Sequence, residues 1–260
     1  ALQMILFFGL AMMIVPLVVG LVLDQGATWR WILVIEGGLS LLSAVGFMGA
    51  PLLDIPGRRN VRPEQLKQVF SHNLGLLLGM MGAGFTYVGA EMTMNVWLPK
   101  FQIEVFHAGD TWASLSVTLF WSGLIAGRLI VMALTKRYSP ARLLLVCACV
   151  MAVFTVAVAL VPSQIASLVL TVGAGLGASA SYGLIGSYSG RFPGWQSSVA
   201  SSIFILSGGI GSITFPYIMG PLADSAGFQT ALALLAVPAI VYALFALLIH
   251  ARSGERDRVR

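Results

Sequence analysis

Long runs of apolar residues, separated by short polar segments, make up most of the chain. A helix needs about 20 apolar residues to cross the roughly 30 Å hydrocarbon core of a bilayer, and each run is long enough. The runs cover residues 1–23, 31–53, 75–98, 112–134, 142–162, 164–188, 197–220 and 228–250. The pattern therefore predicts an all-α, multi-pass transmembrane helical bundle with eight spans.

The composition supports this prediction. Of the 260 residues, 58% are hydrophobic and only 10% are charged, whereas a soluble domain carries about 25% charged residues. A soluble core of this size would leave large apolar patches in water. The composition therefore excludes an ordinary soluble protein and makes the lipid bilayer the expected surroundings of the chain.

The basic residues follow the topology of the spans. Most of the 15 lysines and arginines lie in alternate connecting segments, which would all be on the same side of the membrane. These segments are 54–74, 136–142, the loop with Arg191, and the tail after residue 250. The opposite loops hold Arg30 and Lys100. The positive-inside rule therefore places the 54–74 segment and the C-terminus in the cytoplasm. The net charge of +5 is explained by this asymmetry, and no nucleic-acid partner is expected.

A short repeat indicates how the spans are organised. Residues 16–24 read PLVVGLVLD and residues 216–224 read PYIMGPLAD. The shared positions are Pro16, Gly20 and Asp24 in the first segment and Pro216, Gly220 and Asp224 in the second. A parallel repeat of six helices explains this spacing, and a chance coincidence of proline and glycine is the alternative.

If the repeat is real, the complete protein has twelve helices, and its first four lie upstream of this chain. Residues 1–53 are then the last two helices of the N-terminal half, and 54–74 form a basic cytoplasmic linker. Residues 75–250 form a six-helix C-terminal half, and 251–260 form a basic cytoplasmic tail.

Polar residues inside the spans are the candidate binding residues, because charges within a bilayer are costly and are usually kept for function or pairing. Tyr87, Glu91 and Asn95 are spaced to share one face of the third span. We expect this stripe to line a cavity, where the carboxylate and amide bond a solute. A protonated Glu91 bonded to a neighbouring helix is the alternative.

Two further spans offer candidates of the same kind. In the fourth, Ser114, Thr118, Trp121 and Arg128 form a second stripe. Trp121 could stack on a solute, and Arg128 is expected to neutralise helix C-terminal dipoles or to pair in a cytoplasmic gate. In the sixth, Tyr182 shares a face with small residues and could meet the solute. Glu36 is close enough to its span end to reach the interface or Arg30.

Several of these segments resemble a known family. Gly127-Arg128 with the following Lys136-Arg137 is similar to the signature loop between the second and third helices of each half in the major facilitator superfamily. The segments 87–98, 127–140 and 220–225 resemble its fucose and glucose/galactose permease branch. The resemblance covers essentially the whole chain as helices five to twelve of twelve, so it implies a major facilitator fold that lacks the first four helices.

The resemblance implies a secondary active transporter that moves a small polar solute, a sugar, by alternating access with proton symport. It also implies a bacterial inner membrane location and a monomeric full-length protein. A drug or organic-anion exporter of the same superfamily is the first alternative, and a non-transporting receptor is the second. The sequence contains no motif of a membrane enzyme, and no metal or cofactor site is expected. The residues expected to serve gating or structure are Arg128, Pro16, Gly20, Pro216, Gly220 and Asp224.

Overall fold

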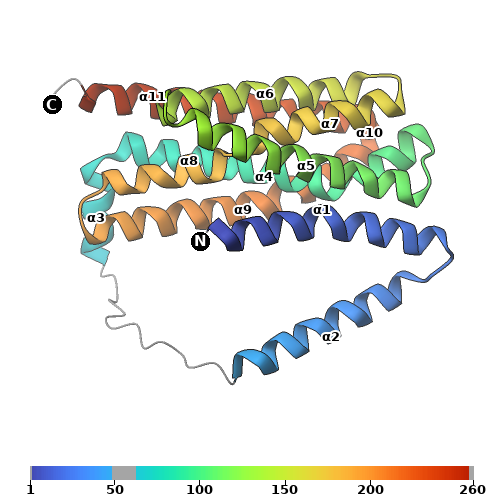
Figure 1. Cartoon of the computed structure of the whole chain (residues 1–260). Coiled ribbons are helices and arrows are strands. Elements are labelled where there is room, and N and C mark those ends of the chain that lie inside the picture. Colours follow the sequence, from blue (N-terminus) through green and yellow to red (C-terminus); the bar gives the residue numbers. More distant parts are fainter. Residues whose placement is uncertain (1, 49–62, 258–260) are drawn as a thin grey trace.

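The computed structural model describes residues 2–48 and 63–257, and within these ranges it consists of helices without strands (Figure 1). The expected all-α bundle is therefore confirmed. The elements are α1 (Leu2–Asp24), α2 (Trp29–Met48), α3 (Pro63–His72), α4 (Leu74–Phe106), α5 (Asp110–Leu134), α6 (Pro140–Leu160), α7 (Gln164–Ala178), α8 (Ser181–Ser187), the 3-10 helix η1 (Tyr188–Arg191), α9 (Trp195–Ala226), α10 (Phe228–Leu234) and α11 (Ala236–Asp257).

Each of the eight predicted spans falls on one helix or on consecutive helices, and residues 49–53 of the second span lie outside the described residues. In the described residues, seven helical segments are long and apolar enough to cross a membrane, and α1 adds the apolar stretch Gly9–Asp24. Two of the seven segments are interrupted: α7, α8 and η1 follow one another in one, and α10 and α11 in another. The hydropathy pattern did not indicate these interruptions.

The third span is longer than predicted, because α4 continues through Pro99 to Phe106. Proline removes one backbone donor from a helix, but packing outweighs this loss. Phe101 and Gln102 are fully buried against the rest of the bundle, and Gln102 donates to the Ser167 hydroxyl at 3.1 Å. The helix ends at His107, whose left-handed backbone (φ 54°) allows its N–H to close the last turn.

Close helix packing holds the bundle together. α4 packs against α9, α11 and α5, while α7 packs against α5 and α6. Gly123 of α5 and Gly175 of α7 face each other's backbone so closely that a Cβ at either would collide with a carbonyl of the other helix. Small residues give this approach in membranes, where van der Waals contact drives helix association.

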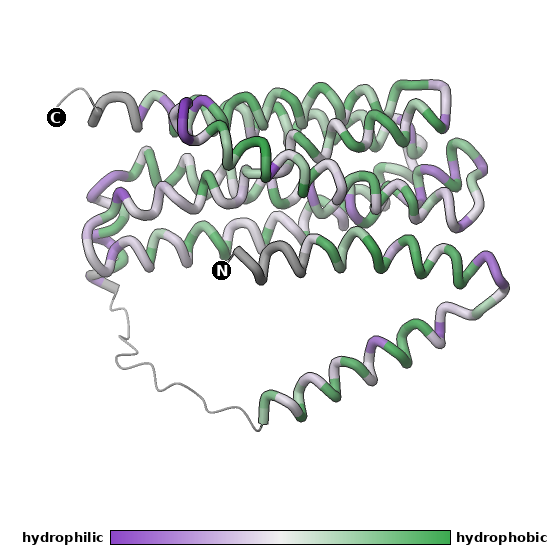
Figure 2. The backbone as a smooth tube through the Cα atoms, viewed as in Figure 1, coloured by the Kyte–Doolittle hydropathy of each residue, from purple (hydrophilic) through white to green (hydrophobic). Residues whose placement is uncertain are grey.

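The first two helices differ in their contacts. α1 packs along α5, whereas no residue of α2 is buried and this helix lies away from the bundle (Figure 1). Hydrophobic residues cover the lengths of the helices, and hydrophilic residues gather at their ends and in the loops (Figure 2). This distribution suits a protein whose outer surface meets lipid.

The basic segments lie at one end of the bundle, at the left in Figure 1, where α3 and the last turn of α11 are found. Part of the expected basic linker forms the helix α3. The rest of that linker, with Arg58, Arg59 and Arg62, lies outside the described residues, as do Arg258 and Arg260. The division at residues 53, 74 and 250 and the cytoplasmic location stay predictions.

Candidate functional site

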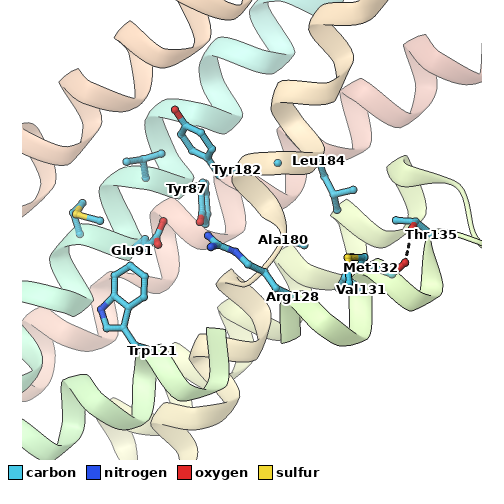
Figure 3. Close-up of a pocket in the computed structure, with 13 residues that line it drawn as sticks. Tyr87, Glu91, Trp121, Arg128, Val131, Met132, Thr135, Ala180, Tyr182 and Leu184 are labelled. Atoms are coloured by element: carbon cyan, nitrogen blue, oxygen red, sulfur yellow. Dashed lines mark hydrogen bonds between the residues drawn. The ribbon is translucent and has the colours of Figure 1, made fainter. Parts of the chain in front are cut away.

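A cavity of about 630 Å³ lies between α4, α5 and the junction of α7 and α8 (Figure 3). Most of its wall is apolar, and its polar groups come from the two predicted stripes and from the sixth span. The lining residues are Tyr87, Val88, Glu91, Met92, Trp121, Arg128, Val131, Met132, Thr135, Ala180, Tyr182, Gly183 and Leu184.

The α4 stripe supplies the acidic group of the cavity. Tyr87 is fully buried and Glu91 is 6% exposed, and both line the cavity, one helical turn apart. Asn95, one turn further along, does not line it. Its side-chain oxygen accepts a 2.7 Å hydrogen bond from the Trp121 indole nitrogen. In the structure, Asn95 therefore contacts Trp121 and not the cavity.

The α5 stripe is divided between two surfaces. Trp121 and Arg128 line the cavity. Thr118 instead donates to the Met13 carbonyl of α1 at 2.8 Å, and Ser114 lies where Gly20 of α1 approaches. The sequence placed all of these on one face but could not show that α1 covers part of that face.

Arg128 connects the cavity to the backbone of a neighbouring helix. Its Nε donates a 2.8 Å hydrogen bond to the carbonyl of Ser179, the C-cap residue of α7. The rest of its guanidinium points toward Tyr87 and Glu91 (Figure 3). Arg128 therefore contacts the C-terminal end of α7, while its expected role in a gate stays a prediction. Arg128 also faces the cavity, which the sequence analysis did not anticipate.

The sixth span is broken beside the cavity. α7 ends at Ala178 and α8 begins at Ser181. Non-helical backbone at membrane depth occurs where protein or a cavity surrounds it, and this break satisfies that condition. Tyr182 follows it, is 41% exposed, and lines the cavity with its ring 5.0 Å from that of Phe204.

Sequence reasoning missed the part of the wall that α5 supplies beyond Arg128. Val131, Met132 and Thr135 follow Arg128 at the spacing of one and two helical turns, so their side chains lie on the same side of α5. That spacing was the available signal. It was not used because an apolar side chain in a membrane helix looks the same in sequence whether it meets lipid, protein or a cavity.

The predicted Pro/Gly/Asp segment of α1 lies against α5. Asp24 accepts hydrogen bonds from the Thr111 backbone N–H, at 3.2 Å, and from the Thr111 hydroxyl. An ideal Cβ on Gly20 would lie 2.7 Å from the Ser114 side chain, so only glycine fits without movement. Asp24 thus caps the first turn of α5, where a carboxylate is favoured by the free N–H groups.

The corresponding segment of α9 has different contacts. The Pro216 carbonyl accepts a 3.1 Å hydrogen bond from the Trp97 indole nitrogen, and Gly220 lies beside the same indole ring. Asp224 is exposed. Both segments lie in long helices that contain proline. The six-helix repeat and the gating roles of these residues stay predictions.

Glu36 is exposed on α2, and this helix lies away from the bundle that holds the cavity (Figure 1).

Comparison with known proteins identifies relatives of this architecture. The family model described as Major Facilitator Superfamily matches residues 4–194 and 113–260, which together cover nearly the whole chain. No curated protein sequence matches the chain.

Solved structures share the fold at low sequence identity. The E. coli fucose:proton symporter FucP matches with a TM-score of 0.65 and 21% identity, over 82% of this chain and 53% of that one. FucP in an outward conformation gives 0.64 and 20%, over 82% and 52%. A peptide transporter, POT, bound to sulfate gives 0.57 and 18%, over 66% and 37%. The chain spans about half the length of the FucP structures.

Proposed function

Since this chain belongs to the major facilitator superfamily, we propose that it works within a secondary active transporter that moves a sugar across a membrane by alternating access, coupled to protons. The observation that carries the proposal is the cavity, where Glu91, Tyr87, Trp121, Arg128 and Tyr182 meet inside a bundle of membrane helices. The fold shared with FucP supports the same class of solute.

The chemistry of the cavity suits a neutral solute with several hydroxyl groups. The Glu91 carboxylate accepts hydrogen bonds, and the free nitrogens of Arg128 donate them. A hydroxyl does both, so one sugar can pair with each group at once. The rings of Trp121 and Tyr182 offer flat apolar surfaces for the C–H face of a sugar ring. Specificity follows because a solute that lacks these hydroxyls leaves buried polar groups unpaired.

The proposed alternating access has a structural counterpart along α5. The helix is covered by α1 from Thr111 to Ile125, and the cavity extends to Thr135 at its other end. Leu129 and Ile130 are more than half exposed in that part. By the positive-inside rule, this end faces the cytoplasm. An opening of the cavity at this end would serve the cytoplasmic step of the proposed cycle.

An exporter of organic anions is a second candidate, and one observation favours it. Most of the cavity wall is apolar, and Arg128 supplies a cation beside it. An anion with a large apolar body would suit these two features. It would also approach the Glu91 carboxylate, and like charges at close range are unfavourable in a low dielectric. A neutral sugar avoids this repulsion, so we place the sugar first.

The test uses membrane vesicles that contain the protein of which this chain is part. Uptake of radiolabelled monosaccharides is measured with and without an imposed pH gradient, and empty vesicles serve as the control. The proposal predicts sugar accumulation that collapses when a protonophore removes the gradient. Extrusion of an organic anion without sugar uptake would support the second candidate, and absence of any flux would reject both.

A further inference from the structure

Behind the cavity, three buried hydroxyl groups have no hydrogen-bond partner of ordinary length and geometry in the described structure. They belong to Tyr87, Tyr242 and Ser181, and each of these residues is 0% exposed. A buried polar group left unpaired costs about 1–3 kcal/mol. Three such groups in one place therefore need an explanation, since native proteins usually pair them with protein or ordered water.

The three residues come from neighbouring parts of the bundle. The rings of Tyr87 on α4 and Tyr242 on α11 lie 5.5 Å apart at an angle of 45°. The Tyr242 hydroxyl faces Ser181, the first residue of α8, and also interacts with Cys147 of α6. We call Tyr87, Tyr242 and Ser181 the hydroxyl cluster. Of its members, only Tyr87 also lines the cavity.

The cluster adjoins the break between α7 and α8. On the cavity side, Arg128 satisfies the Ser179 carbonyl. On the other side, the Ala180 carbonyl accepts from the Leu184 N–H at 2.9 Å, and the Ala180 N–H faces the Cys147 sulfur, which accepts from it. The backbone of the break thus has protein partners, whereas the Tyr242 and Ser181 hydroxyls beside it face each other without a hydrogen bond of ordinary geometry.

We propose that the hydroxyl cluster is an enclosed binding site for ordered water. A buried water makes about three hydrogen bonds to otherwise unsatisfied groups, and three such hydroxyls belong to neighbouring residues here. Polar groups that face each other beyond direct bonding distance are commonly bridged by water at little cost. The charged groups that interact with these hydroxyls are Glu91 and Arg128. Their charges are opposite in sign, so the surroundings suit a neutral ligand such as water.

The water would also support the wall of the solute cavity, and this consequence rests on the proposed function. Tyr87 belongs to both sites, and its hydroxyl faces Glu91 (Figure 3). Water between Tyr242 and Tyr87 holds that hydroxyl in place, so the polar side of the cavity is organised before a solute arrives. The bound water is therefore a positioning element of the site.

Radiolytic hydroxyl-radical footprinting of the full chain in nanodiscs tests the water site without any solute. Radicals formed from a bound water modify the side chains beside it, even where bulk solvent does not reach. We expect Tyr242 to be modified at least about threefold faster than Phe101 and Phe120, although all three are 0% exposed. Tyr242 modification no faster than that of these phenylalanines would overturn the proposal.

A pair of variants provides the second arm. Ser181→Ala removes one partner of the water and should lower Tyr242 modification by about twofold or more. Thr171→Ala is the matched control, because the Thr171 hydroxyl is equally buried but donates within its own helix to the Ser167 carbonyl at 2.9 Å. Equal Tyr242 modification in the two variants would overturn the assignment of Ser181 to the site. The footprint does not depend on transport, so a transport failure alone would count against the proposed function only.

Discussion

Arg128 shows how one side chain can serve both the backbone and the cavity. Its Nε bonds the Ser179 carbonyl at the end of α7, where the free carbonyls of a helix favour a cation. The remaining guanidinium nitrogens point toward Glu91 and Tyr87 (Figure 3). A planar guanidinium can make both contacts at once, which a lysine ammonium on a flexible stem cannot reproduce.

Removing this side chain should loosen the break in the sixth span. In Arg128→Met, the Ser179 carbonyl loses a hydrogen bond to a charged donor, worth about 1.5–3 kcal/mol. We expect amides near residues 179–184 to exchange hydrogen about tenfold faster or more, measured by mass spectrometry in nanodiscs. Arg137→Met, in an exposed loop, is the control. Unchanged exchange at the break would show that Arg128 does not hold it.

Asn95 should influence the solute without touching it. Asn95→Leu leaves the Trp121 N–H without the 2.7 Å hydrogen bond that fixes the ring, and we expect sugar affinity in a calorimetric titration to fall about tenfold, the equivalent of 1.4 kcal/mol. Gln102→Leu, on the same helix, also loses a buried hydrogen bond but lies away from the cavity. If both variants bind sugar equally, Asn95 has no role in positioning Trp121.

At the scale of the helices, the sequence predicted what depends on local composition. Long apolar runs and polar ends define the spans, and helical spacing brought Tyr87 and Glu91 to one surface. The break after Ala178 was not predictable, because the glycines and serines around it also fit a continuous helix packed closely on its neighbours. The contact of Thr118 with α1 was not predictable either, since spacing along one helix does not say which helix lies against it.

The close contact between α5 and α7 at Gly123 predicts how substitution of this glycine changes the stability of the protein. A Cβ on Gly123 would collide with the Val172 carbonyl of α7, whereas Gly209 of α9 has open space around it. We expect Gly123→Ala to cost about 1–3 kcal/mol, as overpacking usually does, and Gly209→Ala to be neutral or slightly stabilising. Thermal unfolding in detergent compares the two. Equal melting temperatures would mean that α5 and α7 are not packed this closely.

The contact between α1 and α5 can be measured as a coupling energy. Asp24 accepts one hydrogen bond from the Thr111 backbone N–H and one from the Thr111 hydroxyl. Thr111→Ala removes the second of these bonds. Removal of an N-terminal helix cap costs about 0.5–2 kcal/mol. In a double-mutant cycle of Asp24→Ala and Thr111→Ala, we expect a coupling energy of at least about 0.5 kcal/mol. Strictly additive effects would show that the two side chains do not interact.

At the scale of the whole molecule, the basic residues predict the orientation in the membrane. The turn at Arg137 belongs to the basic end of the bundle, and Gly109 lies in a loop at the other end. In a background with Cys147→Ser and Cys149→Ser, an impermeant maleimide should label Gly109→Cys in intact cells. Arg137→Cys should react only after permeabilisation, because the positive-inside rule places it in the cytoplasm. The reverse labelling would invert the topology.

The central claim is that this bundle provides a solute cavity in which Glu91 is the acidic binding group. Glu91→Gln and Glu36→Gln each remove one carboxylate from a membrane helix, but Glu91 lines the cavity and Glu36 is exposed on α2. The decisive measurement is sugar uptake driven by a pH gradient in vesicles that contain the protein with each change. We expect Glu91→Gln to lower uptake about tenfold or more, as loss of a hydrogen bond to a charged group predicts, and Glu36→Gln to retain it. Full uptake by Glu91→Gln at unchanged sugar affinity would contradict the account.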